Sequence, residues 1–358
     1  MTHRVTLIPG DGVGPEVSAA ARRCVEATDV QIEWDVQEIG SSRQAAGDSP
    51  LPVTALESIR ERGVALKGPI TTQVAAGARS ANLELRDSLD LYVGIRPCRT
   101  LPGAPTPFPD TDIVVVRMLN EDLYAGIELG PATPEAQRLR ELIGESQRRA
   151  LATDAAFALK PISYAAARRV ADRAFSYARE NARNRVTAIH KATVMPLTDG
   201  LFLEAARAAS ERWPEIGYEE VLVDTACHQL IRNPGGYDVL LAPMLYGDVV
   251  SDLGAAMIGG LGLAPGANLG DRCAVFEPVH GSVPKRAGRN QANPIAMVLS
   301  AAMLLRHLAE EEAAARLEGA VAGVLREGRT LTYDLARASG ISSPATTSEL
   351  ADAVVARL

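Results

Sequence analysis

Asp248 and Asp252, four residues apart, form the clearest candidate site in this sequence. They follow the apolar run VLLA, which predicts a buried strand ending at Pro243. On a helix this spacing places both carboxylates on one face, with their Cβ atoms roughly 5–6 Å apart. Like charges this close repel unless a cation lies between them, and oxygen ligands favour Mg²⁺ or Mn²⁺ over zinc. The pair therefore predicts a metal site at the end of a strand, where α/β enzymes bind ligands.

Three arginines, Arg86, Arg96 and Arg117, supply positive charge earlier in the chain. Arg117 ends the apolar run IVVVR, so we expect it at the rim of a site. Guanidinium groups bind carboxylates through two parallel hydrogen bonds. Any one of these arginines taken alone would be interpreted as part of a surface salt bridge. Together with the hydroxyl of Ser80 and the amide of Asn82, they predict a site for a small ligand carrying two or three carboxylates.

Tyr124 and Lys191 are candidates for proton transfer. Lys191 follows the run RVTAIH, which predicts another strand. A half-buried lysine near a metal ion and arginines has a lowered pKa, which suits a general base, and a tyrosine hydroxyl can donate a proton. The alternatives are a lysine that extends its head into solvent and a tyrosine of the core.

Two glycine-rich loops each follow a predicted strand. In the first, GDGVGPE at residues 10–16, the spacing is GxGxG and not GxGxxG, so it does not support a Rossmann domain. A tight turn that packs a helix on the sheet is the alternative interpretation. In the second, EPVHGSVPKRAG at residues 277–288, His280 stands near Lys285 and Arg286. A histidine alone is usually structural, but these three together predict a cradle for phosphate or ribose.

Composition indicates a soluble enzyme. The chain has 358 residues, enough for two domains with cores of their own. A net charge of −7 argues against a general binder of nucleic acids or anionic membranes. We expect no signal peptide, no bilayer-spanning segment and a cytoplasmic location. The cysteines lack metal-like spacing and are expected as reduced thiols at Cys24, Cys98, Cys227 and Cys273.

Strand and helix patterns alternate along the chain, which favours a sheet sandwiched between helices. The segment 134–150, PEAQRLRELIGESQRRA, is charged and helical and interrupts this alternation, so we interpret it as an insertion and a candidate intersubunit element. The predicted strands are residues 4–8, 31–38, 65–67, 113–117, 185–190, 219–224, 239–241 and 273–277. The predicted helices are residues 15–27, 52–62, 164–180, 198–213, 294–310 and 311–326.

The chain resembles the β-decarboxylating dehydrogenases, the isocitrate/isopropylmalate dehydrogenase family, and in particular bacterial NADP-dependent isocitrate dehydrogenases. The motifs LDLYVGIRP, LYGDVVSDLGAAMIGGLGLAPGAN and HGSVPKRAGRNQANP carry the resemblance, which runs from IPGDGVGPEV to the C-terminus. It implies a two-domain α/β/α sandwich, not a Rossmann fold, with an intersubunit clasp. The implied division is 1–91 plus 259–358 for the large, cofactor-side domain, 92–121 plus 165–258 for the small domain, and 122–164 for the clasp.

The resemblance also implies roles for individual residues. Lys191 and Asp224 would reach the site from the neighbouring subunit, which implies a homodimer with shared active sites. The implied catalytic residues are Tyr124, Lys191 and Asp224. The implied substrate-binding residues are Ser80, Asn82, Arg86, Arg96 and Arg117, and the isopropylmalate enzymes carry apolar residues in place of the first two. The implied ligands of Mg²⁺ or Mn²⁺ are Asp224, Asp248 and Asp252.

For the cofactor, the resemblance favours NADP, with NAD as the alternative. Lys285, Tyr333 and Arg337 match positions that contact the 2′-phosphate, and a cation at Lys285 suits a phosphate monoester. In the family that the chain resembles, NAD-dependent members carry an acidic residue at the position of Lys285. Arg286 stands where the NADP enzymes commonly have a tyrosine. The implied cofactor-binding residues are Thr72, Glu277, His280, Gly281, Ser282, Lys285, Arg286, Asn293, Tyr333 and Arg337.

The implied reaction is the oxidative decarboxylation of a 2-hydroxy acid with a β-carboxylate, with isocitrate giving 2-oxoglutarate. Met118, Thr193 and Met244 depart from the family pattern and are expected at the walls of the site. The alternatives are homoisocitrate, isopropylmalate, malate, tartrate or a phosphonate analogue as substrate, and, from another class, a non-catalytic regulatory subunit. The expected partners are a small polycarboxylate and a second copy of the chain, with no nucleic acid and no membrane.

Overall fold

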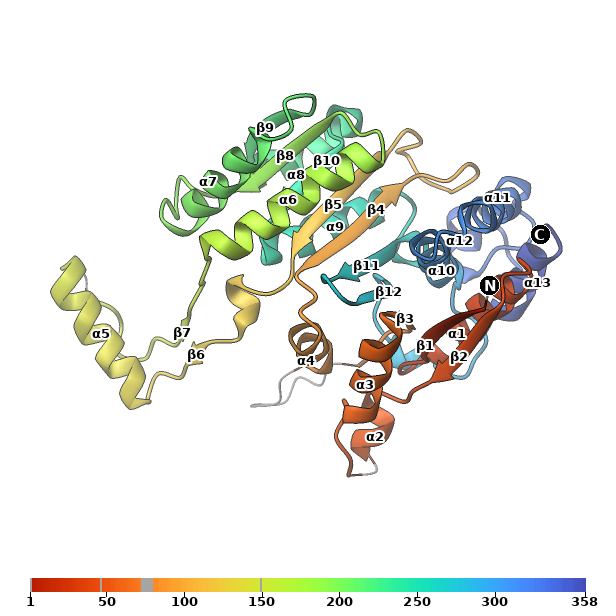
Figure 1. Cartoon of the computed structure of the whole chain (residues 1–358), viewed down its shortest axis with the longest axis horizontal. Coiled ribbons are helices and arrows are strands. Elements are labelled where there is room, and N and C mark those ends of the chain that lie inside the picture. Colours follow the sequence, from red (N-terminus) through yellow and green to blue (C-terminus); the bar gives the residue numbers. More distant parts are fainter. Residues whose placement is uncertain (1, 46, 72–79, 149) are drawn as a thin grey trace.

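A single ten-stranded sheet runs through the protein in the order β2-β1-β3-β12-β11-β4-β5-β10-β8-β9. The computed structural model describes residues 2–45, 47–71, 80–148 and 150–358 (Figure 1). Strands β3 and β10 are buried along their whole length, which explains why they are apolar runs without alternation. The strands are β1 (His3–Ile8), β2 (Ile32–Val36), β3 (Val64–Lys67), β4 (Val93–Arg99), β5 (Asp112–Met118), β8 (Arg185–His190), β9 (Gly217–Leu222), β10 (Val239–Ala242), β11 (Pro265–Leu269) and β12 (Ala274–Pro278).

The middle of the sheet is antiparallel. Strand β11 pairs antiparallel with β12 and β4, and β4 pairs antiparallel with β5, whereas the other pairs are parallel. The sequence analysis did not predict β4 or β11, because Pro97 and Pro265 interrupt both patterns. The sheet order places the early strands β1–β3 beside the late strand β12, as a discontinuous large domain requires. The exact domain boundaries remain a prediction.

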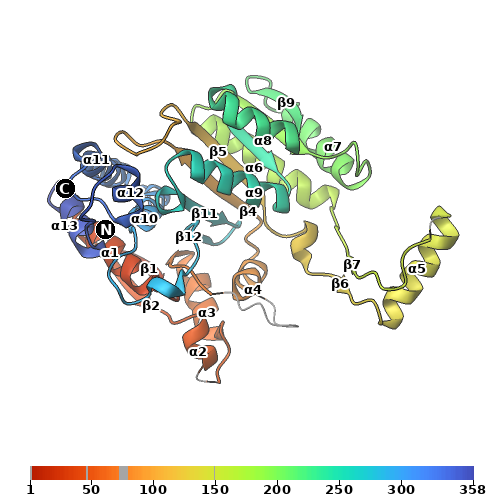
Figure 2. The same cartoon turned by 180° about the vertical axis from the view of Figure 1, so that it is seen from behind.

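Helices cover both faces of the sheet. Helices α6 and α7 lie on one face and α8 and α9 on the other, as the two opposite views show (Figures 1 and 2). Helix α10 is apolar almost all round because it is enclosed by the sheet and by α1 and α11. The helices of the body are α1 (Gly14–Glu26), α2 (Ser41–Ala45), α3 (Val53–Arg62), α4 (Ala81–Ser88), α6 (Tyr164–Glu180), α7 (Thr198–Ser210), α8 (Val223–Arg232), α9 (Met244–Met257), α10 (Ile295–His307), α11 (Glu311–Glu327), α12 (Tyr333–Ala338) and α13 (Thr347–Val355).

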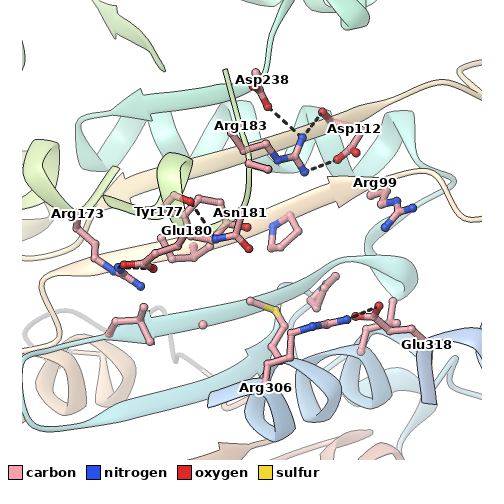
Figure 3. Close-up of a pocket in the computed structure, with 18 of the residues that line it drawn as sticks. Arg99, Asp112, Arg173, Tyr177, Glu180, Asn181, Arg183, Asp238, Arg306 and Glu318 are labelled. Atoms are coloured by element: carbon pink, nitrogen blue, oxygen red, sulfur yellow. Dashed lines mark hydrogen bonds and ion pairs between the residues drawn. The ribbon is translucent and has the colours of Figure 1, made fainter. Parts of the chain in front are cut away.

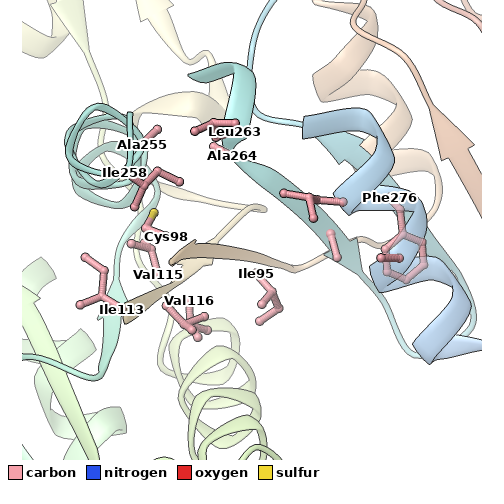
Figure 4. Close-up of a cluster of buried hydrophobic side chains, with 14 of the residues drawn as sticks. Ile95, Cys98, Ile113, Val115, Val116, Ala255, Ile258, Leu263, Ala264 and Phe276 are labelled. Carbon is pink, nitrogen blue, oxygen red and sulfur yellow. The ribbon is translucent and has the colours of Figure 1, made fainter. Parts of the chain in front are cut away.

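Helix α9 lies close against β4 and β5, and two glycines allow it. A Cβ on Gly247 would lie 2.6 Å from Arg117 Cγ, and one on Gly254 would lie 2.7 Å from Cys98 Sγ. Seven residues separate these glycines, so they lie on the same face of the helix. Behind them the apolar side chains of β4, β5 and α9 form a continuous cluster (Figure 4). The close approach fixes the height of α9 above the sheet.

An arm projects from the body between residues 126 and 160 (Figure 1, yellow). It consists of α5 (Pro134–Gln147) and the antiparallel pair β6 (Glu128–Leu129) and β7 (Phe157–Ala158). The expected helical insertion is therefore confirmed as a helix. Its apolar side chains are poorly covered: Ile127, Leu142 and Leu159 are 44%, 60% and 40% exposed.

Several local expectations differ from the structure. The predicted strand 219–224 ends at Leu222, and Asp224 stands in the first turn of α8, which was not predicted. All four cysteines are unpaired, as expected. Among the described residues, none of the helices combines the length and apolarity needed to cross a membrane. The cytoplasmic location remains a prediction.

Candidate active site

The predicted aspartate pair stands on α9, which begins directly after β10 at Pro243. Asp252 is exposed and makes no hydrogen bond or ion pair to another described residue. Partial burial and the nearby charge of Asp248 raise the pKa of Asp252. Two oxygen donors on one helix face, with repulsion between them, fit a divalent cation. These residues therefore suit Mg²⁺ or Mn²⁺, as the spacing predicted.

Asp248 is the centre of the polar cluster. Its carboxylate accepts hydrogen bonds from Arg117 and from the hydroxyl of Tyr124, and Arg96 Nη1 lies 3.4 Å from Oδ1. Burial alone would raise the pKa of Asp248, but Arg117, the Tyr124 hydroxyl and Arg96 together lower it. Burial and the bond to Asp248 raise the pKa of Tyr124, so the tyrosine holds its proton. The cluster therefore joins a proton donor, two arginines and a candidate metal ligand.

The elements that build this cluster lie far apart in sequence. Arg96 and Arg117 come from the antiparallel neighbours β4 and β5, and Asp248 comes from α9. Tyr124 stands on the 3₁₀ turn Asp122–Ala125, directly after β5. The structure thus brings together four of the predicted site residues where α9 covers the central strands β4 and β5.

Arg117 is 1% exposed, and its Nη2 atom has no hydrogen-bond partner among the described residues. Its Nε donates to the carbonyl of Met244 at 2.8 Å, and its guanidinium lies 5.1 Å from the Tyr124 ring centroid. Asn82, at the start of α4, likewise has a buried Oδ1 without a partner. Buried polar atoms are normally paired, so these two fit contacts to a bound polar ligand. Ser80 is the residue before α4 and is half-buried.

A second cluster surrounds Glu277 on β12. Arg86 Nη2 lies 3.1 Å from Oε1, Asn268 Nδ2 donates to the same oxygen at 2.6 Å, and the ammonium of Lys67 pairs with Oε2. Burial opposes ionisation, but Lys67 and Arg86 hold the pKa of Glu277 well below its ordinary value. Glu277 therefore acts as the anchor of Arg86. The sequence analysis missed Lys67, because a lysine at the end of the strand VALK has the pattern of an ordinary strand end.

Lys191 and Asp224 form a separate pair. Lys191 Nζ donates to Asp224 Oδ1 at 2.6 Å, and this bond lowers the pKa of Asp224. The part of the chain that the structure describes contains no group of three acidic, histidine or cysteine side chains able to hold a metal ion. One chain therefore does not assemble Asp224 with Asp248 and Asp252. This separation agrees with the expectation that Lys191 and Asp224 serve a neighbouring subunit.

The predicted cofactor loop follows β12 and packs on the first glycine loop. The carbonyl of Ser282 accepts a bond from Val13 N at 2.9 Å, and its hydroxyl accepts one from Thr71 at 2.7 Å. A Cβ on Gly12 would lie 1.9 Å from that Ser282 carbonyl, so glycine is required there. The tight-turn interpretation of GDGVG therefore fits, with the turn supporting the cofactor loop. Thr72 lies outside the described residues.

Other predicted cofactor residues gather around this loop. His280 Nδ1 lies 3.0 Å from the carbonyl of Gly281, while Nε2 is buried without a partner, and burial lowers the pKa of the ring. Asn293 donates to Asp334 at 2.9 Å at the start of α12. The Arg286 guanidinium stacks on the Tyr333 ring at 3.6 Å. Lys285 and Arg337 are exposed beside this stack.

The three departures from the family pattern occupy different environments. Met118 and Met244 are fully buried, and the carbonyl of Met244 accepts the bond from Arg117 Nε. Thr193 is exposed in the turn after Lys191. The expectation that the three form walls of the site stays a prediction.

A cleft of about 1270 Å³ lies away from all these residues, between α6 and the pair α10 and α11 (Figure 3). Several of its charged side chains are already paired with one another. Arg183 bonds to Asp112 and Asp238, and Arg306 bonds to Glu318. None of the predicted site residues lines this cleft. Ile95, Pro97 and Arg99 of β4 line it, whereas Arg96 of the same strand contacts Asp248 of α9, so the polar cluster lies on the opposite face of the sheet.

Comparisons with known proteins agree with this site. Residues 4–354 match the sequence profile of the isocitrate/isopropylmalate dehydrogenase family. The probable isocitrate dehydrogenase (NAD) subunit alpha, mitochondrial, of Drosophila melanogaster is 42% identical over 334 residues, which cover 93% of this chain and 83% of that protein. The chloroplastic 3-isopropylmalate dehydrogenase of Solanum tuberosum is 43% identical over 91% of this chain and 86% of its own. The crystal structure of isocitrate dehydrogenase from Methylococcus capsulatus has a TM-score of 0.91 and 41% identity, with 99% of both chains covered.

The matching family uses NAD(P) and a divalent metal ion, and its members act on small polycarboxylates as dimers. The named relatives differ in substrate, so the match defines the class of reaction and leaves the substrate open. The chain therefore belongs to the isocitrate/isopropylmalate dehydrogenase family, which confirms the expected α/β fold and the expected enzyme class, an NAD(P)-dependent β-decarboxylating dehydrogenase.

Proposed function

We propose that the protein is an NADP-linked isocitrate dehydrogenase that converts isocitrate to 2-oxoglutarate in sites shared between two copies of the chain. The observation that supports this most is the cluster at Asp248, where Arg96, Arg117 and Tyr124 meet, with Arg117 Nη2 buried and unpaired. A carboxylate of the substrate would satisfy that nitrogen.

Substrate binding would use the arginines of both polar clusters, the one at Asp248 and the one at Glu277. Arg86, anchored by Glu277, and the Arg96–Arg117 pair present three guanidinium groups from α4, β4 and β5. Ser80 and Asn82, at the start of α4, would face the third carboxylate of isocitrate. Polar residues at these two positions are the reason for preferring isocitrate to isopropylmalate, because the Ser80 hydroxyl and the Asn82 amide N–H can donate to a carboxylate, whereas an alkyl group accepts no hydrogen bond from either.

Two residues of the chain would move protons. Lys191, as the neutral amine, would accept the proton of the substrate hydroxyl, directly or through Asp224, whose Oδ1 lies 2.6 Å from Nζ. Tyr124, whose pKa is raised, would then donate a proton to C3 after carbon dioxide is lost. Asp248 would hold the Tyr124 hydroxyl in place through its hydrogen bond.

A divalent ion would be held by Asp248 and Asp252 of one copy and Asp224 of the other, and it would supply Lewis-acid stabilisation of negative charge on the substrate. The nicotinamide cofactor would supply the hydride acceptor. The proposed clasp, residues 122–164, contains the projecting arm, whose exposed Ile127, Leu142 and Leu159 would pack against the second copy. The domain boundaries given above are part of the same proposal.

The preference for NADP is supported by charge. Lys285, Arg286 and Arg337 stand around Tyr333, and the guanidinium of Arg286 is already stacked on that ring. Three cations suit a phosphate monoester better than a ribose hydroxyl. NAD is the alternative, since several relatives at similar identity are named as NAD enzymes.

The test is NADPH formation at 340 nm with isocitrate and Mg²⁺, beside NAD⁺ and beside isopropylmalate. We expect turnover with isocitrate of order 1–10³ s⁻¹ and a preference for NADP⁺. Turnover with isopropylmalate alone would contradict the argument from Ser80 and Asn82. No turnover with either acid while Mn²⁺ still binds would direct attention to homoisocitrate, malate, tartrate or a phosphonate analogue, or to a non-catalytic subunit.

A further inference from the structure

Lys160 is a nearly buried lysine that none of the steps above uses. It follows β7, where the arm returns to the body, and its side chain is 11% exposed. Its ammonium pairs with Asp199 and lies 3.9 Å from Asp122, and both carboxylates are fully buried. It also lies 3.5 Å from the Tyr246 hydroxyl and 4.7 Å from that ring's centroid. Burial of a lysine between two carboxylates costs desolvation, so it requires an explanation.

The first carboxylate, Asp199, holds the proposed base. Asp199 stands in the first turn of α7, and its second oxygen accepts the backbone N–H of Lys191 at 2.6 Å. The turn after Lys191 closes on the same residue, since Val194 N and Met195 N both donate to the Lys191 carbonyl. Asp199 therefore fixes the backbone from which the Lys191 side chain extends.

The second carboxylate, Asp122, holds the other half of the site. Asp122 begins the 3₁₀ turn that carries Tyr124, in the left-handed region at φ +69°. Its Oδ1 accepts Leu123 N at 2.8 Å, and its Oδ2 accepts Leu245 N at 2.9 Å in the first turn of α9. Asp122 therefore ties the Tyr124 turn to the helix of Asp248.

We propose that Lys160 is a positioning residue that holds the Lys191 loop and the Tyr124–α9 unit in one fixed arrangement. One cation pairs with Asp199 and reduces the repulsion from Asp122, and each carboxylate uses its other oxygen for a backbone N–H of a catalytic element. Lys160 stands where the arm rejoins the body, so the same residue links the proposed clasp to the Lys191 loop and to the Tyr124–α9 unit. Its role in catalysis rests on the proposed function.

The test compares Lys160→Met with wild type and with a matched control, Arg183→Met. Arg183 also bridges two carboxylates, with bonds of 2.6 Å to Asp112 and 3.0 Å to Asp238, but at the opposite ends of β5 and β10. We expect Lys160→Met to lower kcat by about 10- to 100-fold with KM changed less than about threefold, because small misplacements of reacting groups are costly. The control should lose thermal stability and keep kcat.

A double variant, Lys160→Met with Asp199→Asn, separates charge from folding. The asparagine removes the unpaired charge and keeps an oxygen for Lys191 N, so most of the lost kcat should return. If Lys160→Met does not fold, Lys160→Gln takes the same assay with the same expected direction, because its amide still reaches toward Asp199 without carrying charge.

Hydrogen exchange of the unliganded protein supplies a readout that does not depend on substrate. In Lys160→Met, amides of residues 191–195 and 245–248 should exchange about tenfold faster, while the control leaves them unchanged. Unchanged exchange there, with kcat within twofold of wild type, would overturn the proposal. An inactive wild type would instead count against the proposed function, and the exchange result would still decide the role of Lys160.

Discussion

The hydroxyl of Tyr124 donates a hydrogen bond to Asp248, so the proposed proton donor is bonded directly to a proposed metal ligand. Arg117 bonds to the other oxygen of the same group. A cation bound to Asp248 and Asp252 would therefore change the electrostatic field of the carboxylate to which the Tyr124 hydroxyl is bonded. In the proposed function, Asp248 would couple substrate, metal and proton donor, and this coupling leads to the first prediction.

Tyr124→Phe should reduce turnover of isocitrate by about 10²–10⁴-fold, the range for loss of a general acid. The protein should stay folded, because Asp248 keeps Arg117 and Arg96 as partners. Steady-state NADPH formation and a thermal unfolding curve check both parts. Tyr237→Phe, which alters a tyrosine outside the cluster, is the control and should behave as wild type.

Two inactive variants should restore activity when they are mixed. If Lys191 serves the partner's site, then Lys191→Met and Tyr124→Phe subunits combine into heterodimers with one intact site and one doubly altered site. Random exchange of subunits should then recover about a quarter of the wild-type activity. Sites built within single chains would give no recovery, so mixing after mild dissociation and reassociation decides the arrangement.

Lys67→Met should destabilise the protein by about 3–5 kcal/mol, because it leaves the buried carboxylate of Glu277 with fewer partners. The folded-state pKa of Glu277 lies below its ordinary value of 4.5, so its stabilising contribution is present above that value and is lost as the pH falls below it. In the variant this part of the acid dependence should flatten. Urea unfolding from pH 7 to pH 3.5 measures both effects, and Lys67→Met with Glu277→Gln should regain stability.

Lys285→Asp should shift cofactor preference from NADP toward NAD by about 10- to 100-fold in the ratio of kcat/KM, because the carboxylate repels the 2′-phosphate. Arg289→Asp, an exposed change of the same charge on the same loop, is the control for general electrostatics. An equal shift in both variants would remove the special role assigned to Lys285.

Much of the fold could be predicted from the sequence where local pattern and tertiary environment agree. The strand Arg185–His190 and the helix Tyr164–Glu180 have the predicted bounds, since their apolar periodicity continues to the last residue. The central strands β4 and β11 escaped prediction because their prolines are accommodated only by the sheet that forms around them.

The candidate site divides in the same way. The aspartate pair on α9 was predictable because four residues make one helical turn. Lys67 and Lys160 were not, because Lys67 ends one short strand, Lys160 follows another, and their partners Glu277 and Asp199 lie far along the chain. A buried ion pair between distant segments leaves no local pattern, so the supports of a site are harder to predict than its reacting groups.

The projecting arm has a consequence for how this protein responds to dilution. Ile127, Leu142 and Leu159 are exposed on a segment that the rest of its own chain does not cover. If each site takes Lys191 from a second copy, mass action links specific activity to protein concentration. When the two copies separate, each loses both the partner surface that covers its arm and the Lys191 that serves its site. Below the dissociation constant of the dimer, activity per molecule would fall as the protein is diluted. The total concentration of the chain would therefore determine the fraction of it that is active.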